Sequence, residues 1–212
     1  MILNSKKYPK TWHVPWSTGT SDDKTLDDDN DFKGLQIVQT LKMDGENTSI
    51  YRNGMHARSM ESANHPSQSW VKQLAGQIGW QLDDETRICG ENLYALHTVP
   101  YTDLESYFML FSVWTLDECW NWQDTKKFAD YLRLITVPVI YEGVYDPMKI
   151  IEAFQPYKES HEGYVIRNQE SFQYKDFKHN VAKFVNPGFR QTLKQSTVHW
   201  ASAPVVPNKL KK

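Results

Sequence analysis

The sequence predicts an α+β fold built mainly from antiparallel sheets. Short segments with the composition of strands outnumber helical segments, and the two kinds do not alternate regularly along the chain. In addition, the pair Asn53-Gly54 separates strand segments, and both of these residues tolerate the positive φ of a hairpin turn. These observations favour hairpin-connected strands with flanking helices over a regular parallel sheet.

The first forty residues are predicted to be rich in loops. The run from Ser21 to Asp31 contains six Asp and one Lys, so its charges repel one another and we expect an exposed loop. It lacks the ligand spacing and the glycine of a calcium loop. From residue 34 onward strand patterns dominate, because Leu35, Ile37 and Leu41 alternate with other residues and 48–51 forms a second apolar, β-branched run.

Three later segments have helical periodicity. They are residues 68–82, residues 125–135 with Asp124 as the predicted cap, and residues 148–154 with Pro147 near the first turn. Further strands are predicted at 87–93, 107–114, 137–141, 163–167 and 181–185. The length of 212 residues predicts one domain over 1–212.

Composition limits the class of protein. The chain is 40% hydrophobic, no run approaches 18 uncharged apolar residues, and the first residues lack the apolar stretch of a signal peptide. With only two cysteines, it is predicted to be a reduced, cytoplasmic protein. Residues 158–212 hold ten basic and four acidic side chains, a net +6, while the rest carries −8. This basic quarter could face a polyanion or form a solvated surface.

Several common catalytic motifs are absent from the sequence. There is no P-loop, no glycine-rich dinucleotide motif after a strand, no His-Glu-x-x-His and no Gly-x-Ser-x-Gly. The candidate site instead begins at Lys42-x-Asp44-Gly45, which is predicted to be a tight turn holding a cation at the sheet edge, the tip of a first hairpin. Such a motif arises by chance in roughly one chain of this length in twenty, so alone it also fits a surface turn.

Support comes from charged residues inside short apolar strands. Glu91, Glu162 and Lys183 each lie at the start or in the middle of such a strand. A charge there is costly unless it is paired or functional. An internal salt bridge is the alternative explanation.

In order along the chain, the motifs resemble those of the covalent nucleotidyltransferases, the superfamily of ATP-dependent DNA ligases, RNA ligases and mRNA capping enzymes. The series is Lys42-x-Asp44-Gly45, Arg58, Glu91, Phe111, Glu162-Gly163 and Lys183. Residues 7–9, 90–94 and 182–185 look most like RNA ligases, and the resemblance spans about residues 7–200. It implies an adenylation domain. Since 27 residues follow Val185, no OB-fold domain is expected.

The resemblance implies that Lys42 attacks the α-phosphate of ATP, with Mg²⁺ or Mn²⁺, to form a lysyl–AMP intermediate. AMP then passes to a 5′-phosphate RNA end, which is sealed to a 3′-hydroxyl. Because a free lysine is protonated at neutral pH, Lys183, Arg58 and the metal are expected to lower the pKa of Lys42. The implied nucleotide-binding residues are Leu41, Asp44, Gly45, Arg58, Glu91, Phe111, Glu162 and Lys183, with Glu162 as metal ligand and Asn47 at the nucleic-acid end.

Two positions depart from the family pattern. Leu41 stands where many relatives have Glu. The last motif usually has two lysines, but here only Lys183 is present, and Lys178 or Arg190 could substitute for the second. The predicted partner is RNA, at a nick, at a hairpin break or in single strands, and the predicted state is a monomer. Two alternatives remain open: a DNA or mixed-strand ligase, and a degenerate nucleotidyltransferase module that only binds nucleic acid.

Overall fold

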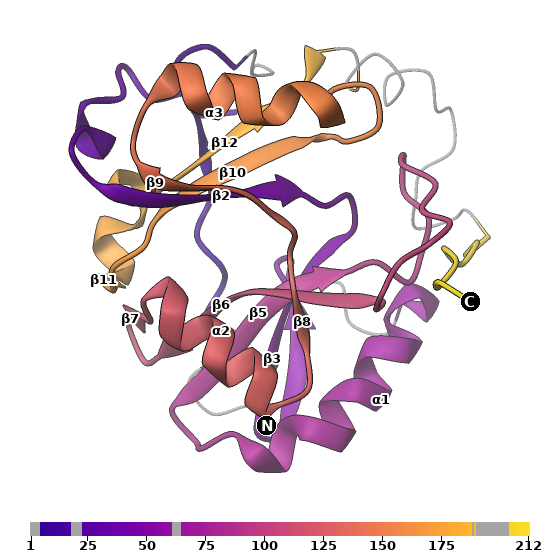
Figure 1. Cartoon of the computed structure of the whole chain (residues 1–212). Coiled ribbons are helices and arrows are strands. Elements are labelled where there is room, and N and C mark those ends of the chain that lie inside the picture. The colour runs from indigo at the N-terminus through magenta and orange to yellow at the C-terminus, as the bar shows by residue number, and fades with distance from the viewer. Residues whose placement is uncertain (1–4, 18–22, 61–64, 188, 190–203) are drawn as a thin grey trace.

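The protein folds into two sheets that face each other (Figure 1). The computed structural model describes residues 5–17, 23–60, 65–187, 189 and 204–212. The first sheet holds, in order, β1 (Trp12–His13), β12 (Val181–Val185), β10 (Gly163–Asn168), β2 (Gln36–Lys42) and β9 (Val139–Val144). The second holds β11 (Phe172–Gln173), β7 (Glu118–Cys119), β6 (Phe108–Thr115), β5 (Thr86–Asn92), β3 (Glu46–Tyr51) and β4 (Gly54–Ala57), with β8 (Ile135–Thr136) beside β6.

Pairing within both sheets is mainly antiparallel. Only β1 with β12 and β6 with β8 pair in parallel among the described strands. The predicted α+β class is therefore confirmed, and the described residues form no OB-fold domain. The predicted hairpin is also confirmed, because Tyr51 pairs with Gly54 and Gly54 has a φ of 151°.

Among the described residues, three α-helices lie on the outer faces of the sheets (Figure 1). The helices are α1 (Ser69–Ile78), α2 (Trp122–Tyr131) and α3 (Pro147–Phe154), and the 3₁₀ helices are η1 (Asn30–Phe32), η2 (Pro66–Gln68), η3 (Gly79–Gln81), η4 (Gln155–Tyr157) and η5 (Tyr174–His179). An apolar cluster joins α1 and α2 to the second sheet, and Ile150 and Phe154 of α3 belong to the cluster that includes the first sheet. Within the described part of the chain, no helix combines the length and apolarity needed to span a bilayer.

The helix at 125–135 begins and ends earlier than the sequence predicts. Its cap is Asn121, whose side-chain oxygen accepts a hydrogen bond of 2.8 Å from the amide of Asp124, so the prediction of Asp124 as cap is wrong. Asn and Asp cap about equally well, and burial of Trp122 favours the earlier start. At the other end Arg133 has a φ of 55°, which ends the helix and lets Ile135 join β8.

The acidic run 21–31, whose last two residues belong to η1, is not simply an exposed loop. Leu26 is buried in the apolar cluster of the first sheet, and the carboxylate of Asp23 faces Lys183 at 3.7 Å. The prediction of an exposed loop is therefore wrong at these two positions, because each has a partner on the sheet. Residues 21 and 22 of the run lie outside the described residues.

The segment that carries Lys42 joins the two sheets. Sequence patterns predict a hairpin tip at a sheet edge here, but β2 pairs with β9 and β10, whereas β3 pairs with β4 and β5. The hairpin prediction is wrong, because consecutive strands can also belong to facing sheets. A Cβ at Gly45 would lie 2.4 Å from the carbonyl oxygen of Asn92, so only glycine permits this close crossing.

Candidate active site

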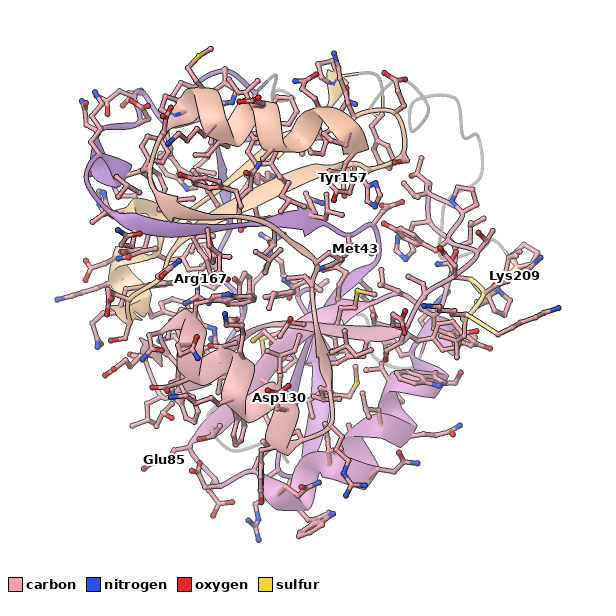
Figure 2. All side chains as sticks on the ribbon, in the orientation of Figure 1. Met43, Glu85, Asp130, Tyr157, Arg167 and Lys209 are labelled. Atoms are coloured by element: carbon pink, nitrogen blue, oxygen red, sulfur yellow. The ribbon has the colours of Figure 1, made fainter. Side chains whose placement is uncertain are left out.

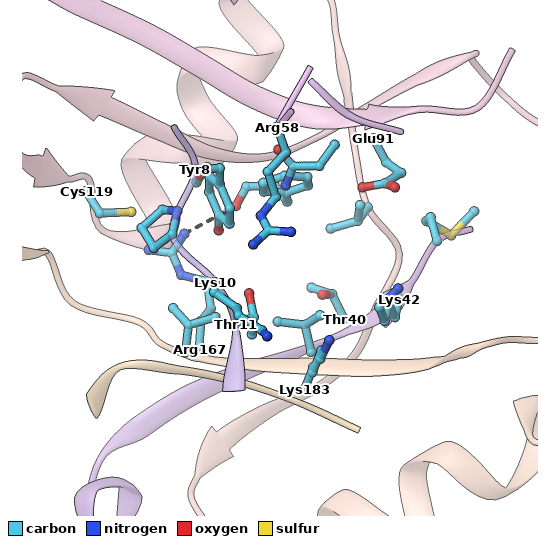
Figure 3. A pocket seen from close by; sticks show the side chains of 18 of the residues that line it. Tyr8, Lys10, Thr11, Thr40, Lys42, Arg58, Glu91, Cys119, Arg167 and Lys183 are labelled. Atoms are coloured by element: carbon cyan, nitrogen blue, oxygen red, sulfur yellow. Dashed lines mark hydrogen bonds between the residues drawn. The ribbon is translucent and has the colours of Figure 1, made fainter. Parts of the chain in front are cut away.

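A cavity of about 390 Å³ lies between the two sheets where the Lys42 segment crosses. Figure 3 shows Arg58 and Glu91 reaching it from the second sheet and Thr40, Lys42 and Lys183 from the first. Of the residues selected from the sequence, those that line it are Leu41, Lys42, Asn47, Arg58, Glu91, Phe111 and Lys183. Glu162 contacts Lys42 directly, while Asp44 and Gly45 form the turn beside the cavity. The structure thus brings the whole predicted set together.

Lys42 is the last residue of β2 and lies opposite Gly163, the first residue of β10. This register places Glu162 next to Lys42, and their side chains form an ion pair that is largely shielded from solvent. Burial by itself lowers the pKa of the Lys42 amine, but attraction by Glu162, Glu91 and Asp44 outweighs it, so the pKa is raised. In the free protein Lys183 and Arg58 therefore do not produce the expected lowering of this pKa, because the charges nearest the amine are carboxylates rather than cations. A lowering by a bound metal stays a prediction.

Glu91 reaches the cavity from β5, where its Oε1 accepts a hydrogen bond of 3.2 Å from the amide of Gly45. Burial raises the pKa of the Glu91 carboxyl to about 8, and repulsion by Glu162 and Asp44 adds to the rise while Lys42 opposes it. Near neutral pH a large share of this carboxyl is protonated. It can then both donate and accept hydrogen bonds, which suits recognition of hydroxyl groups.

We expect Glu91 to make stability depend on pH. Its ordinary pKa is 4.5, so between that value and about 8 the folded protein holds a proton that the unfolded chain has lost. Stability due to this proton falls as pH rises through that window. In Glu91→Gln the contribution disappears. Urea unfolding should therefore show the parent losing free energy of unfolding relative to the variant from about pH 5 to about pH 8.

Glu85→Gln provides the matched control, because Glu85 is exposed and immediately precedes β5 (labelled in Figure 2). It makes the same change of a carboxyl to an amide outside the cavity. A pH-independent difference between the parent and Glu91→Gln would contradict the raised pKa.

Asp44 turns its carboxylate away from the cavity. Its Oδ2 accepts hydrogen bonds of 2.7 Å from the amides of both Thr98 and Val99. Its own amide donates to the hydroxyl of Tyr101 at 3.0 Å. Asp44 therefore fixes the turn after Lys42 through backbone contacts.

Lys183, Arg58 and Asn47 also line the cavity, Lys183 from the same sheet as Lys42. The amine of Lys183 is 3.7 Å from Asp23, which in turn lies 3.4 Å from Nε2 of the buried His13. Arg58 follows β4, and its amide donates to the carbonyl of Asn47. The side-chain oxygen of Asn47 is buried without a hydrogen-bond partner among the described residues, so it is available to a ligand.

Sequence patterns missed several lining residues. Arg167 of β10 is buried between the sheets (Figure 2) and donates hydrogen bonds to the carbonyls of Phe111 and Trp120. It could have been selected in the same way as Glu91, because it is a charged residue in an apolar strand. The segment Tyr8–Thr11 gave no such signal, because it reaches the cavity through the parallel pairing of β1 with β12. Lys178 and Arg190 were the predicted substitutes for the second lysine that the last motif lacks. Lys178 lies over the ring of Trp12, and Arg190 lies outside the described residues. Lys10 of the segment Tyr8–Thr11 does line the cavity.

The cavity fits a nucleotide in size and chemistry. Phe111 offers an aromatic ring beside apolar Val137 and Val165, and lysine and arginine side chains line the same space. Among the described residues, no group of three or more metal-binding side chains occurs. Magnesium at nucleotide sites usually takes one or two carboxylates together with phosphates and water, and Glu162 suits that arrangement.

Comparison with known families identifies the class. The family model described as RNA ligase matches residues 35–185, and the chain belongs to this family. A comparison with curated protein sequences gives no match.

Solved structures share the fold at low sequence identity. An archaeal ATP-dependent RNA ligase is 14% identical with a TM-score of 0.54, over 86% of this chain and 48% of that one. A mutant of Naegleria gruberi RNA ligase solved with ATP and Mn is 16% identical with a TM-score of 0.52, over 79% and 54%. A putative ATP-dependent DNA ligase from Aquifex aeolicus is 14% identical with a TM-score of 0.52, over 74% and 46%. The chain thus spans about half the length of these structures.

Proposed function

We propose that this protein is an ATP-dependent RNA ligase that joins a 5′-phosphate end to a 3′-hydroxyl end. One observation carries the proposal: Lys42, Arg58, Glu91, Phe111 and Lys183 converge on a single cavity from both sheets. Family membership and the ATP and Mn in the Naegleria gruberi structure support the nucleotide and the need for a divalent cation.

In the first step, the Lys42 Nζ bonds to the α-phosphorus of ATP, and the bond from that phosphorus to the bridging oxygen breaks. Pyrophosphate leaves with the electron pair. The amine, which is charged beside Glu162 in the free protein, loses one proton to solvent before the attack and a second one as its bond to phosphorus forms. Lys183 and Arg58 offset the charge on the phosphates. A bound divalent cation supplies further positive charge there, and Glu162 is the proposed protein ligand.

Side chains around Lys42 are proposed to hold the rest of the nucleotide. Phe111 stacks on the base, and Glu91, with its raised carboxyl pKa, bonds the ribose hydroxyls. AMP is then transferred from Lys42 to the 5′-phosphate of the nucleic acid. The 3′-hydroxyl attacks that phosphate, and AMP leaves. Asn47, whose acceptor oxygen lacks a partner among the described residues, is the proposed contact for the end being sealed.

A sealing panel tests the substrate. The protein is incubated with ATP, Mg²⁺ or Mn²⁺, and matched nicked duplexes or single strands whose termini are RNA or DNA. We expect joining at RNA ends to be faster than at DNA ends, because a 2′-hydroxyl distinguishes the two. Equal joining of DNA would support the DNA or mixed-strand alternative. Covalent labelling without joining of any substrate would support the degenerate binding module.

A further inference from the structure

Residues 204–212, here named the C-terminal strap, are bound along the segment 93–107. Backbone hydrogen bonds link the two at several points, and Ala95 with Pro207 and Leu104 with Leu210 form isolated β-bridges. The bonds run from Leu96 to Val206, Asn208 to Tyr94, Lys209 to Tyr101, Leu104 to Lys209 and Lys211 to Leu104. In Figure 2 the labelled Lys209 lies at the side of the molecule, while Met43 lies between the sheets.

Asn208 is the most deeply bound residue of the strap and is only 3% exposed. Its side-chain oxygen accepts from the amide of Tyr101 at 3.1 Å, and its Nδ2 donates to the carbonyls of Leu93 at 2.8 Å and Ala95 at 3.3 Å. The hydroxyl of Tyr107 donates to its carbonyl at 2.9 Å. A buried side chain with this many partners is costly to remove, because each partner is left without a hydrogen bond.

The segment held by Asn208 also holds the turn that follows the proposed nucleophile. The amides of Thr98 and Val99 bind the Asp44 carboxylate, and the Tyr101 hydroxyl accepts from the Asp44 amide. The side chain of Met43 belongs to one apolar cluster with residues of the same segment: Leu93, Val99, Tyr101 and Leu104. Two contacts therefore separate Asn208 from the backbone next to Lys42.

We infer that Asn208 is a positioning residue for Lys42: the C-terminal strap fixes the segment 93–107, which fixes the turn at Asp44. This inference rests on the proposed function. Asn208 and Tyr101 do not line the cavity, so they act on the geometry of the amine without touching nucleotide. Small errors in the position of a reacting group cost large factors in rate, whereas nucleotide binding depends on the residues that line the cavity.

Three full-length variants test the inference. Asn208→Ala removes the bonds to Leu93, Ala95 and the Tyr101 amide. Tyr101→Phe removes only the hydroxyl that accepts from Asp44, and covers the case in which Asn208→Ala fails to fold. Lys211→Ala is the control on the same strap, because it loses only an exposed ion pair with Glu105.

Single-turnover formation of protein-bound AMP should be about tenfold slower at saturating ATP in Asn208→Ala and Tyr101→Phe. The KM for ATP should stay near the parent value, and Lys211→Ala should match the parent in both. Hydrogen exchange gives a readout independent of activity: the amides of Thr98 and Val99 should exchange faster in Asn208→Ala than in the parent.

Parental rates in both Asn208→Ala and Tyr101→Phe would overturn the inference, as would a loss expressed mainly in the KM for ATP. If the parent itself forms no protein-bound AMP, the proposed function fails, and hydrogen exchange alone then decides the structural coupling. Unchanged exchange at Thr98 and Val99 in that case also overturns it.

Discussion

Lys42→Ala is expected to abolish covalent labelling of the protein by α-labelled ATP. Because the proposed bond to AMP forms on this amine, removing the amine should reduce the label at least about a thousandfold. Lys42→Arg should be equally inactive, since arginine keeps the positive charge facing Glu162 but has no amine that can become neutral. The protein is incubated with α-labelled ATP and a divalent cation, and the label that stays on the protein is measured after a denaturing gel.

Two controls make this result specific. Lys127→Ala changes an exposed lysine on α2 whose partner is Asp124, and should label like the parent. Circular dichroism of Lys42→Ala checks that the variant is folded. The check is needed because the variant leaves the shielded Glu162 carboxylate without its cation. Label that persists in a folded Lys42→Ala protein would show that another residue is the nucleophile.

Gly163→Ala is expected to be the most destabilising small substitution in the first sheet. A Cβ there would lie 2.0 Å from the carbonyl oxygen of Phe184, which is backbone and paired within the sheet. Relief requires β10 and β12 to separate, so we expect a loss of about 3 kcal/mol in the free energy of unfolding. That corresponds to a fall of about 10 °C in Tm for a chain of this size.

Gly76→Ala gives the opposite expectation for the same chemical change. Gly76 lies within α1, and nothing lies within 4 Å of a Cβ at that position. Alanine favours a helix over glycine by up to about 1 kcal/mol, so this variant should be more stable than the parent. Urea unfolding of both variants measures the difference, and a Gly163→Ala protein as stable as the parent would contradict the packing described for β10.

Local patterns predicted the elements well where the periodicity was strong. The strand at 181–185 has the predicted bounds, and α3 begins at Pro147 as expected, with Asp146 as its cap. They failed where tertiary contacts decide. The two-residue strands β1, β7, β8 and β11 are too short to carry a pattern, and the assignment of β2 and β3 to different sheets depends on partners far along the chain.

The predicted site residues were brought together, although their electrostatics were not predictable. The order of motifs identified residues on both sheets that share the cavity with Lys42. It could not show that attraction by Glu162 and Glu91 outweighs the effect of burial on the pKa of that amine, or that Asp23 faces Lys183. Such effects depend on distances between side chains, which one sequence does not contain. The roles of these residues, the monomeric state and the cytoplasmic location stay predictions.

The pairing of β1 with β12 sets an order for folding during synthesis. Trp12 pairs with Ala182, so the segment Tyr8–Thr11, which lines the cavity, cannot be fixed by β12 until residues 181–185 have been synthesised. Contacts this distant in sequence form slowly and late. A nascent chain can complete most of the second sheet beforehand. The cavity between the sheets is therefore completed only after β12 has been synthesised.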